Sequence, residues 1–352
     1  MSALSRSLPF LVSAVLSLSA GCQEYNLQGP ETVVTSYNPP DLEVARKEDR
    51  VTQVAVPAVD VLFVVDNSGS MIEEQDNLRQ NFEGFMDYFT DSGLDYHVGV
   101  VSTDMDDRQQ SGRLQQDDGR GGRYIDNTYS GADAVSSFRQ RAALGTNGSR
   151  DERGKDAAYT ALTTEANSTN AGFYREEAVL SIVVISDEID YSRKISTQEF
   201  ISWMNSLKPE DDQTWFSSIV GPAPRGCSSG AGNAEEGVGY LEVTDGVGGI
   251  TYSICESDYS SVLEELGMQA AGLKREFFLS EAPVPDTITV SVTTDGDREK
   301  FDEDAWTYSG TRNSVTFSSY VPDPLAVVGI SYETLADAQA PERDDAADTA
   351  ED

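Results

Sequence analysis

The stretch that decides the fold is VDVLFVVDNSGSM, residues Val59–Met71, in which an apolar run leads directly into an Asp-x-Ser-x-Ser motif. Seven of the eight residues from 58 to 65 are apolar. Such a run is typical of a strand that is covered on both faces, as the central strands of parallel sheets are. The carboxylate of Asp66 is therefore predicted at the carboxyl end of a buried strand.

Two hydroxyls follow this carboxylate. Ser68 and Ser70 belong to a short loop that contains Gly, so their side chains are able to converge on the point that Asp66 faces. Oxygen ligands of this kind suit Mg²⁺, Mn²⁺ or Ca²⁺ rather than zinc. A second interpretation exists, because Ser70 and Glu73 have the spacing of a capping box at the start of a helix. Spacing alone leaves both interpretations open.

The motif resembles the opening strand and metal-ion-dependent adhesion site of von Willebrand factor type A domains. A second apolar strand, AVLSIVVISDEIDYS at 178–192, is similar to the strand of that family whose terminal Asp joins the site, here Asp187. Glu188 stands where Gly is usual, as in a bacterial subgroup whose strand ends in Ser-Asp-Glu. The similarity covers residues 58–280 and implies an α/β fold with a doubly wound, mostly parallel sheet flanked by helices.

The family also uses a Thr hydroxyl on a loop before the next helix. Residues 144–154, LGTNGSRDERG, offer Thr146 and Ser149, with Glu152 as a carboxylate substitute. We favour Ser149 over Thr146, because the helix is predicted to begin at Asp151 and the family's Thr lies just before that point. Ser149 is equally placed to cap the helix, so the assignment stays open.

The composition excludes some classes of ligand. The 352 residues include 61 Asp and Glu against 25 Lys and Arg, which gives a net charge of −36. Such a surface argues against nucleic acid, whose binders carry basic patches, and against electrostatic adsorption to anionic lipid. Hydrophobic residues make up 38% of the chain, a normal share for a globular core.

The amino-terminal residues predict export. Arg6 precedes an apolar stretch from Leu8 to Leu18, which small residues follow, as in a secretory signal peptide. Residues 18–22, LSAGC, resemble a bacterial lipoprotein signal and imply lipidation of Cys22, although Ser19 stands where Leu is preferred. We expect residues 1–21 to be removed and the protein to be anchored in the bacterial cell envelope, or to be secreted if it is not lipidated.

Two further cysteines fit an oxidising compartment. With Cys22 assigned to the lipid, Cys227 and Cys255 are predicted to form a disulfide that closes a Gly/Ser-rich loop. A redox or nucleophilic role is the lesser interpretation, because neither cysteine has a neighbouring His.

The single His argues against several enzyme classes. His97 lies in the apolar strand 96–103 and is interpreted as a structural residue. A Ser-His-Asp triad or a His-rich zinc site would have to use it. A metal-assisted hydrolase remains an alternative, with Glu188 or Asp190 as the general base. We expect a protein that is not an enzyme.

Periodicity predicts the remaining organisation. The domains are a tether at 22–57, the α/β domain at 58–280, a small antiparallel β-module at 281–335 and a disordered acidic tail at 336–352. Helices are predicted at 71–89, 151–164, 196–208 and 257–273, and further strands at 96–103, 178–186 and 214–221. The segment 104–141 has no clear pattern and is interpreted as a rim of the ligand face, with a surface insertion as the alternative.

The resemblance implies a metal-dependent protein-binding module for adhesion or envelope assembly. The serine and loop hydroxyls would bind the cation directly, and Asp66 and Asp187 directly or through water, with Asp104 and Glu188 supporting them. Mg²⁺ is the expected cation, with Ca²⁺ or Mn²⁺ as alternatives, and a carboxylate of an unidentified protein partner would complete its coordination. A structural envelope lipoprotein without a ligand is the remaining alternative.

Overall fold

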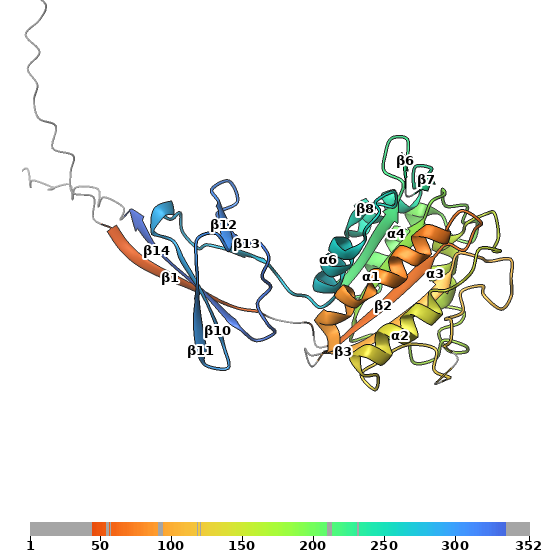
Figure 1. The fold of residues 1–352 in the computed structure, drawn as a ribbon, viewed down its shortest axis with the longest axis horizontal. Coiled ribbons are helices and arrows are strands. Elements are labelled where there is room, and N and C mark those ends of the chain that lie inside the picture. Colours follow the sequence, from red (N-terminus) through yellow and green to blue (C-terminus); the bar gives the residue numbers. More distant parts are fainter. Residues whose placement is uncertain are drawn as a thin grey trace, which may run out of the picture. The chain divides into compact units, whose positions relative to one another are not determined.

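The computed structural model describes residues 44–53, 56, 58–90, 94–117, 119, 121–209, 213–230 and 232–335 (Figure 1). The predicted signal peptide, Cys22, the first part of the tether and the acidic tail lie outside the described residues. Within the described part of the chain, no helix combines the length and the apolar character that crossing a membrane requires.

A five-stranded sheet forms the centre of the α/β domain, and every pair of adjacent strands in it is parallel. Its strands, in spatial order, are β3 (Asp95–Ser102), β2 (Ala58–Val65), β4 (Val179–Ser186), β5 (Thr214–Val220) and β8 (Thr251–Ser253). Val65 is level with Ser102 on one side and with Ile185 on the other. The residues that follow β2, β3 and β4 therefore meet at one edge of the sheet.

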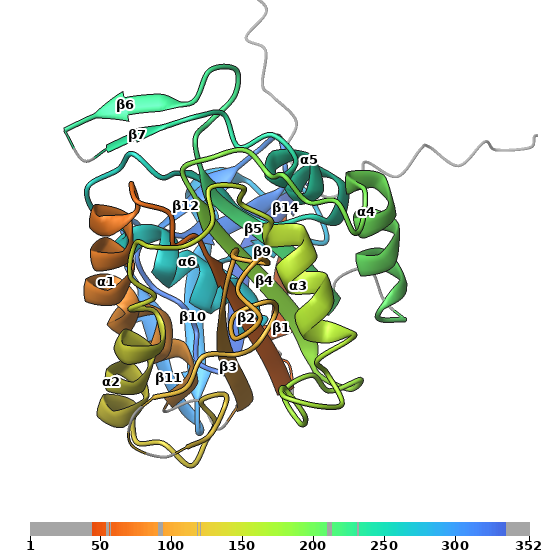
Figure 2. The same ribbon diagram turned by 90° about the vertical axis from the view of Figure 1, so that its right-hand side faces the viewer.

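Helices cover both faces of this sheet (Figure 2). One face carries α1 (Ile72–Thr90), α2 (Gly131–Arg141) and α6 (Ser260–Ala270). The other carries α3 (Gly154–Leu162), α4 (Thr197–Ser206) and α5 (Tyr240–Val247). The predicted fold class, a doubly wound and mostly parallel α/β sheet, is confirmed.

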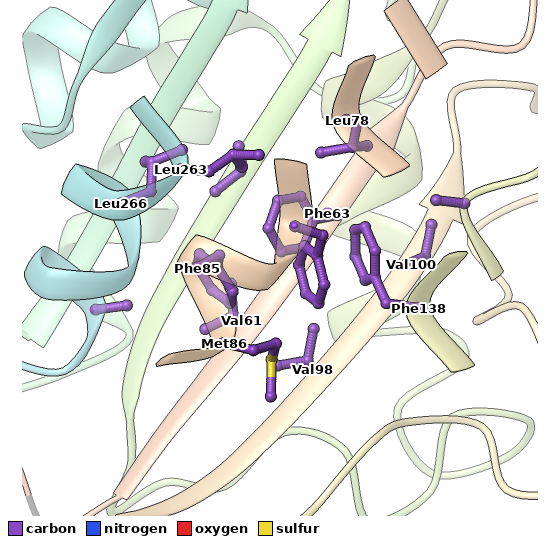
Figure 3. Packing of buried hydrophobic residues seen from close by; sticks show 14 of the residues in the cluster. Val61, Phe63, Leu78, Phe85, Met86, Val98, Val100, Phe138, Leu263 and Leu266 are labelled. Carbon is purple, nitrogen blue, oxygen red and sulfur yellow. The ribbon is translucent and has the colours of Figure 1, made fainter. Parts of the chain in front are cut away.

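The two faces of β2 explain these layers, because successive side chains of a strand point to opposite sides. Phe63 packs against Phe138 of α2, with ring centroids 5.0 Å apart (Figure 3). It also packs against Phe82 of α1, with ring centroids 5.6 Å apart. Leu62 and Val64 belong to the core on the opposite side, with residues of α3, α4 and α5. Full burial of a side chain such as Phe63 contributes about 1.5–3 kcal/mol.

The segment 104–141 contains more structure than its sequence indicates. Its last part is α2, which the sequence analysis missed because only Ala134, Val135 and Phe138 give it an apolar stripe. The preceding residues run along the edge strand β3, where Ile125 exchanges two backbone hydrogen bonds of 2.8 Å with Val98. Part of the segment therefore covers a sheet edge, which would otherwise expose unpaired backbone groups.

The β-module consists of two antiparallel sheets that share one core. The first contains β1 (Val44–Thr52), β14 (Val327–Leu335), β10 (Thr289–Thr294) and β11 (Asp297–Phe301). The second contains β12 (Trp306–Ser309), β13 (Ser314–Phe317) and β9 (Glu276–Phe278). A short 3₁₀ helix, η2 (Pro285–Thr287), precedes β10. The alternating pattern predicted for this module is therefore present.

Two boundaries of the β-module differ from the prediction. Residues 44–52 were expected to be part of a tether, but they form β1, which pairs with β14 along its whole length. The polar sequence of β1 conceals this role, because an edge strand is held by backbone pairing and tolerates charged side chains. The module also begins earlier than residue 281, since Phe277 of β9 is buried in its core.

Candidate metal centre at the carboxyl end of the parallel sheet

Asp66 lies directly after β2 and is held by hydrogen bonds to β4 and to the serine loop that follows it. Its N–H donates to the carbonyl of Ile185 on β4 at 2.9 Å. Its carboxylate accepts from the N–H of Ser68 and from the hydroxyl of Ser186, each at 2.7 Å. The side chain is completely buried. Its position is therefore fixed by the sheet and not by the loop alone.

Ser68 and Ser70 present their hydroxyls on the same side of the loop. Their Oγ atoms are 3.1 Å apart. Burial raises the pKa of Asp187, and the nearby hydroxyl of Ser70 opposes this rise. The two serines and Asp187 are thus brought together, as the sequence analysis expected.

The capping-box interpretation of the same loop is not supported. Among the described hydrogen bonds, none joins Ser70 to Glu73. The loop is tied instead by Gln75, whose side-chain amide donates to the carbonyls of Asp66 at 2.9 Å and Gly145 at 3.0 Å. Both interpretations were open on spacing, and the structure assigns the Ser70 hydroxyl to the acidic site.

Asp187 reaches the same place from the end of β4. It is 5% exposed, and its Oδ1 has no hydrogen-bond partner in the described structure. Burial raises the pKa of Asp187, and the nearby Glu235 raises it further. The N–H of Glu235 donates to the backbone carbonyl of Asp187 at 2.8 Å, which joins this strand end to the loop that carries the disulfide.

Glu152 is the acidic residue that the structure places against Asp66. Its carboxylate accepts a hydrogen bond from the hydroxyl of Thr103, which follows β3, and the charge of Asp66 raises the pKa that burial has already raised. Glu152 is completely buried, and its Oε1 has no partner among the described groups. The sequence analysis named Glu152 only as a substitute and missed Thr103, because a lone Thr after a strand carries no motif.

The preferred loop hydroxyl, Ser149, has other partners. Its Oγ donates to the carboxylate of Asp106 at 3.1 Å and accepts from the N–H of Asp151 at 3.2 Å. Thr146 is half-buried. It lies beside the serine loop, because its backbone carbonyl oxygen would be 3.9 Å from a Cβ atom added at Gly69. Ser149 does not cap a helix either, because α3 begins at Gly154 rather than at Asp151 and its N-cap residue, Arg153, has no side-chain capping bond.

The acidic groups of the site are electrostatically unbalanced. Burial raises the pKa of Asp66 to about 6, with a further increase from Asp187. Burial and the charge of Asp66 raise the pKa of Glu152 to about 9. Among the described residues, no Lys or Arg forms an ion pair with these carboxylates, whereas neighbouring acids such as Asp190 have one, with Lys155 at 3.1 Å.

The donor set fits a hard divalent cation. Two buried oxygens, Asp187 Oδ1 and Glu152 Oε1, lack partners, and a cation would satisfy both and offset the clustered negative charge. Among the described residues, no group of three or more His, Cys, Asp or Glu side chains is arranged to hold a metal by itself. The hydroxyls of Ser68 and Ser70 would therefore have to contribute.

Asp104 and Glu188 occupy different positions around the site. Asp104 organises the loops, because its carboxylate accepts from the N–H groups of Asp106 at 2.8 Å, Asp107 at 3.0 Å and Ser149 at 3.2 Å. Glu188 is half-buried, and burial followed by the charges of Asp66 and Asp187 raises its pKa to about 7. Asp104 therefore supports the loops, while Glu188 belongs to the acidic cluster itself.

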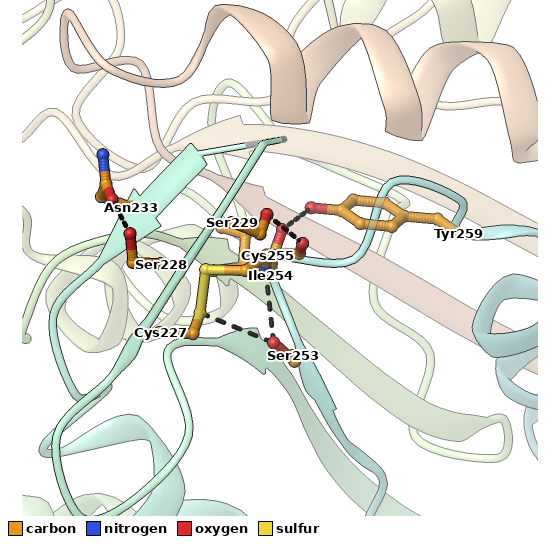
Figure 4. The surroundings of a disulfide bond; sticks show 8 residues. All are labelled: Cys227, Ser228, Ser229, Asn233, Ser253, Ile254, Cys255 and Tyr259. Carbon is orange, nitrogen blue, oxygen red and sulfur yellow. Dashed lines mark hydrogen bonds between the residues drawn. A yellow bond between two sulfur atoms is a disulfide. The ribbon is translucent and has the colours of Figure 1, made fainter.

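The predicted disulfide between Cys227 and Cys255 is present, with 6.1 Å between the Cα atoms (Figure 4). Cys227 opens a hairpin of β6 (Cys227–Ser229) and β7 (Gly232–Ala234), which the sequence analysis did not predict. A Cβ at Gly232 would lie 2.5 Å from a carboxylate oxygen of Glu74 on α1. The disulfide therefore secures a hairpin that reaches the edge of the acidic site.

His97 lies far along β3 from this site and has a structural environment. Its Nδ1 is 2.8 Å from the carbonyl of Phe173 and 3.5 Å from the carboxylate of Asp60, near the amino end of β2. Burial lowers the pKa of His97, so the neutral form is favoured.

No protein-family model and no curated protein matches the sequence. Solved structures similar to the chain include a von Willebrand factor type A protein from Catenulispora acidiphila, with 13% identity and a TM-score of 0.38, over 83% of this chain and 65% of that one. The pilus adhesin SpaC from Lactobacillus rhamnosus GG has 9% identity and a TM-score of 0.39, over 82% of this chain and 40% of that one.

A third similar structure is proximal thread matrix protein 1 from the mussel byssus, solved with a zinc-occupied MIDAS motif. It has 17% identity and a TM-score of 0.38, over 64% of this chain and 48% of that one. The chain spans less than two thirds of each of these three proteins. What the chain itself shows is an α/β domain of the class that its motifs, similar to those of von Willebrand factor type A domains, predict.

Proposed function

We propose that the carboxyl end of the parallel sheet binds a divalent cation, Mg²⁺ in the first place, and that the cation binds a carboxylate presented by a protein partner. One observation carries this proposal: Asp66, Glu152 and Asp187 are buried together without a basic partner among the described residues. Burying charges in this way is costly unless a counter-charge is supplied. A bound cation supplies it and adds a position for an external ligand.

The surface around the site supports a protein partner. Six large hydrophobic side chains are exposed among the described residues, and three of them, Ile72, Tyr191 and Val238, belong to segments next to the site. Ile72 opens α1 two residues after Ser70. The N–H of Tyr191 donates to the carbonyl of Glu152 at 2.6 Å. Exposed apolar groups around a polar centre are typical of protein interfaces.

A metal-assisted hydrolase is the second candidate, and the pKa of Glu188, raised to about 7, favours it. A group with this pKa is suited to act as a general base near neutral pH. The other proposed base, Asp190, is paired with Lys155 at 3.1 Å and accepts a hydrogen bond from Ser192 at 2.8 Å. Binding is preferred because Asp190 is engaged and His97 lies elsewhere. Hydrolysis of a carboxylic or phosphate ester that is lost in Glu188→Gln would reverse this preference.

We further propose that the protein works in the bacterial cell envelope, anchored through a lipid on Cys22. The lipoprotein-like signal supports this placement, and so does the Cys227–Cys255 disulfide, because disulfides persist in oxidising compartments. The anchored protein is expected to enter the detergent phase on phase partition, and Cys22→Ser to remain in the aqueous phase or to keep its signal. Wild-type protein found only in the aqueous phase would leave secretion as the alternative.

Calorimetric titration with Mg²⁺, Mn²⁺ and Ca²⁺ tests the metal site directly. Wild-type protein is expected to bind one equivalent, and Asp187→Asn to bind at least about 100-fold more weakly, since a charged ligand is lost. Asp286→Asn is the matched control, because it removes one exposed carboxylate from η2 in the β-module. Absence of binding to the wild type would overturn the proposal.

The partner is sought by cross-linking in the native envelope with Mg²⁺ and with a chelator. Proteins captured by wild type, lost on chelation and absent with the Asp187→Asn bait are the expected result. Capture that chelation leaves unchanged would show that the cation is not part of the contact.

A further inference from the structure

A cavity of about 430 Å³ adjoins the candidate metal centre. Asp187 and Glu188 line it from the end of β4, and Arg225 and Glu235 line it from the loop that the disulfide closes. Asp187, whose buried Oδ1 has no hydrogen-bond partner in the described structure, is thus both a residue of the candidate metal centre and a lining residue of the cavity. The site therefore continues beyond the cation into a space of its own.

Arg225 is the basic residue that lines this cavity. It is exposed, and among the described residues no carboxylate lies within ion-pair distance of its guanidinium, although Glu188 and Glu235 line the same space. Among the described residues that line the cavity, Arg225 carries the positive charge, against the carboxylates of Asp187, Glu188 and Glu235. Its charge is available to a ligand, and a guanidinium binds a carboxylate through two parallel hydrogen bonds.

The loop that carries Arg225 is held against the metal centre at several points. The disulfide joins Cys227, two residues after Arg225, to Cys255 after β8. The N–H of Glu235 donates to the carbonyl of Asp187 at 2.8 Å, and Gly237 donates to the carbonyl of Gly221 at 2.9 Å. These contacts fix the base of the loop, so the position of Arg225 relative to Asp187 is set by the fold.

Tyr191 also lines the cavity, and the residue is 39% exposed. Tyr and Arg are the residue types most enriched among the side chains that dominate binding energy at protein interfaces. An aromatic ring, an unpaired guanidinium and a candidate cation are thus presented together.

We infer that Arg225 is a specificity-determining residue, and that the partner segment carries two acidic side chains, one for the cation and one for Arg225. This inference rests on the proposed function, because the first carboxylate is the one that the cation binds. The second carboxylate enters the cavity beside Tyr191 and pairs with the guanidinium. A partner segment with a single acidic residue forms only the first of these contacts.

The test uses the full exported chain with saturating Mg²⁺ and synthetic peptides as probes. One peptide, acetyl-Gly-Asp-Gly-amide, carries a single carboxylate, and a series adds a Glu one to four residues after the Asp. Calorimetry is expected to show that at least one member of the series binds about three- to fivefold more tightly than the single-carboxylate peptide, as partly exposed ion pairs do. In Arg225→Ala this preference is lost, while Mg²⁺ binds no more weakly, because a nearby positive charge has been removed.

Arg108→Ala is the matched control. Arg108 is exposed on the loop after β3, at the same edge of the sheet, and does not line the cavity. It removes the same charge and should keep the preference. Equal binding of all peptides by wild type and Arg225→Ala, with Mg²⁺ bound, would overturn the inference and leave the proposed function standing. A wild type that binds neither Mg²⁺ nor any peptide would overturn both, and a uniform loss of Mg²⁺ affinity in Arg225→Ala would make Arg225 structural.

Discussion

Each end of β2 has a buried aspartate, and only the one at the amino end is paired with a basic side chain in the described structure. At the amino end, Asp60 is completely buried and its carboxylate accepts from the N–H of Arg175 at 2.7 Å and from its guanidinium at 2.8 Å. Burial raises the pKa of Asp60 to about 6, although the charge of Arg175 opposes the increase. Lys208 closes this end by donating to the carbonyls of Arg175 and Glu176 at 2.7 and 2.9 Å.

Asp66, at the other end, is just as buried, and burial raises its pKa to about 6 as well. Its carboxylate accepts from the hydroxyl of Ser186 and the N–H of Ser68, and the charge of Asp187 raises its pKa further, without an ion pair to a Lys or Arg in the described structure. The difference shows how this fold uses buried acids. Asp60 receives its counter-charge from Arg175, whereas no described Lys or Arg neutralises Asp66, which is why the proposed cation is placed there.

The first prediction concerns the amino end of β2, where Arg175 neutralises Asp60. Arg175→Ala should lower the free energy of unfolding by about 3–5 kcal/mol at neutral pH, because it leaves the buried carboxylate of Asp60 without its partner. Urea denaturation measures this loss. The control is Arg193→Ala, which removes a pair with Asp151 whose side chains are both largely exposed and should cost less than about 1 kcal/mol. Similar losses in the two variants would remove the contrast.

The second prediction concerns the carboxyl end of β2, where the negative charge of Asp66 is removed. Asp66→Asn should leave the metal-free protein as stable as wild type or more stable, because it removes one of several facing charges. The wild type should gain about 2.7 kcal/mol when Mg²⁺ is present at 100 times its dissociation constant, and the variant should lose this gain. Thermal unfolding with Mg²⁺ and with chelator measures both effects. A variant that keeps the gain would contradict the assignment of Asp66 as a ligand.

The third prediction concerns pH. The folded-state pKa values of Asp66 and Glu152, about 6 and about 9, lie above those of the unfolded chain, so the folded state binds more protons between pH 5 and 8. The contribution of these two carboxyl groups to the free energy of unfolding is fully present below their pKa values in the unfolded chain. It is lost as the pH rises through their pKa values in the folded protein. In chelator, the free energy of unfolding should therefore fall by about 5 kcal/mol from pH 5 to pH 8, with about 4 kcal/mol from Glu152 and about 1 kcal/mol from Asp66.

Saturating Mg²⁺ should flatten this dependence, because the cation replaces the protons. Glu152→Gln should reduce the slope in chelator, since it removes the group with the highest pKa. Urea denaturation at four pH values distinguishes these cases. A metal-free protein that becomes more stable between pH 5 and pH 8 would show that these carboxylates do not control the titration.

Much of the α/β domain was predictable because its signals are local. The apolar run of β2, the strand at 178–186 and the aromatic stripe of α1 each report burial directly in the sequence, and all three elements are present. β1 was not predictable in this way, because its many charged side chains are typical of an exposed linker. Its pairing with β14 also joins residues nearly 300 positions apart, which no local pattern reports. Short elements such as β8, with three residues, carry too few side chains for a period.

The candidate site divides in the same manner. Asp66, Ser68 and Ser70 share one loop, so their convergence follows from spacing, and Asp187 follows from the parallel register of β4. The loop from 144 to 154 has no such constraint, because its path depends on Asp104 and on the N–H of Gly148 donating to the carbonyl of Asn67 at 2.8 Å. Sequence alone could not decide which residue of that loop turns inward.

The last prediction compares the two residues of that loop directly. Glu152→Gln should weaken Mg²⁺ binding by about tenfold, corresponding to about 1.4 kcal/mol, because the amide keeps the size of the side chain and removes the charge that faces Asp66. Ser149→Ala should change the affinity by less than twofold, since its hydroxyl contacts Asp106 and Asp151 instead. Calorimetric titration of both variants at pH 8 measures the difference. A large loss in Ser149→Ala with wild-type affinity in Glu152→Gln would restore the loop hydroxyl as the ligand, and it would require the loop to rearrange when the cation binds.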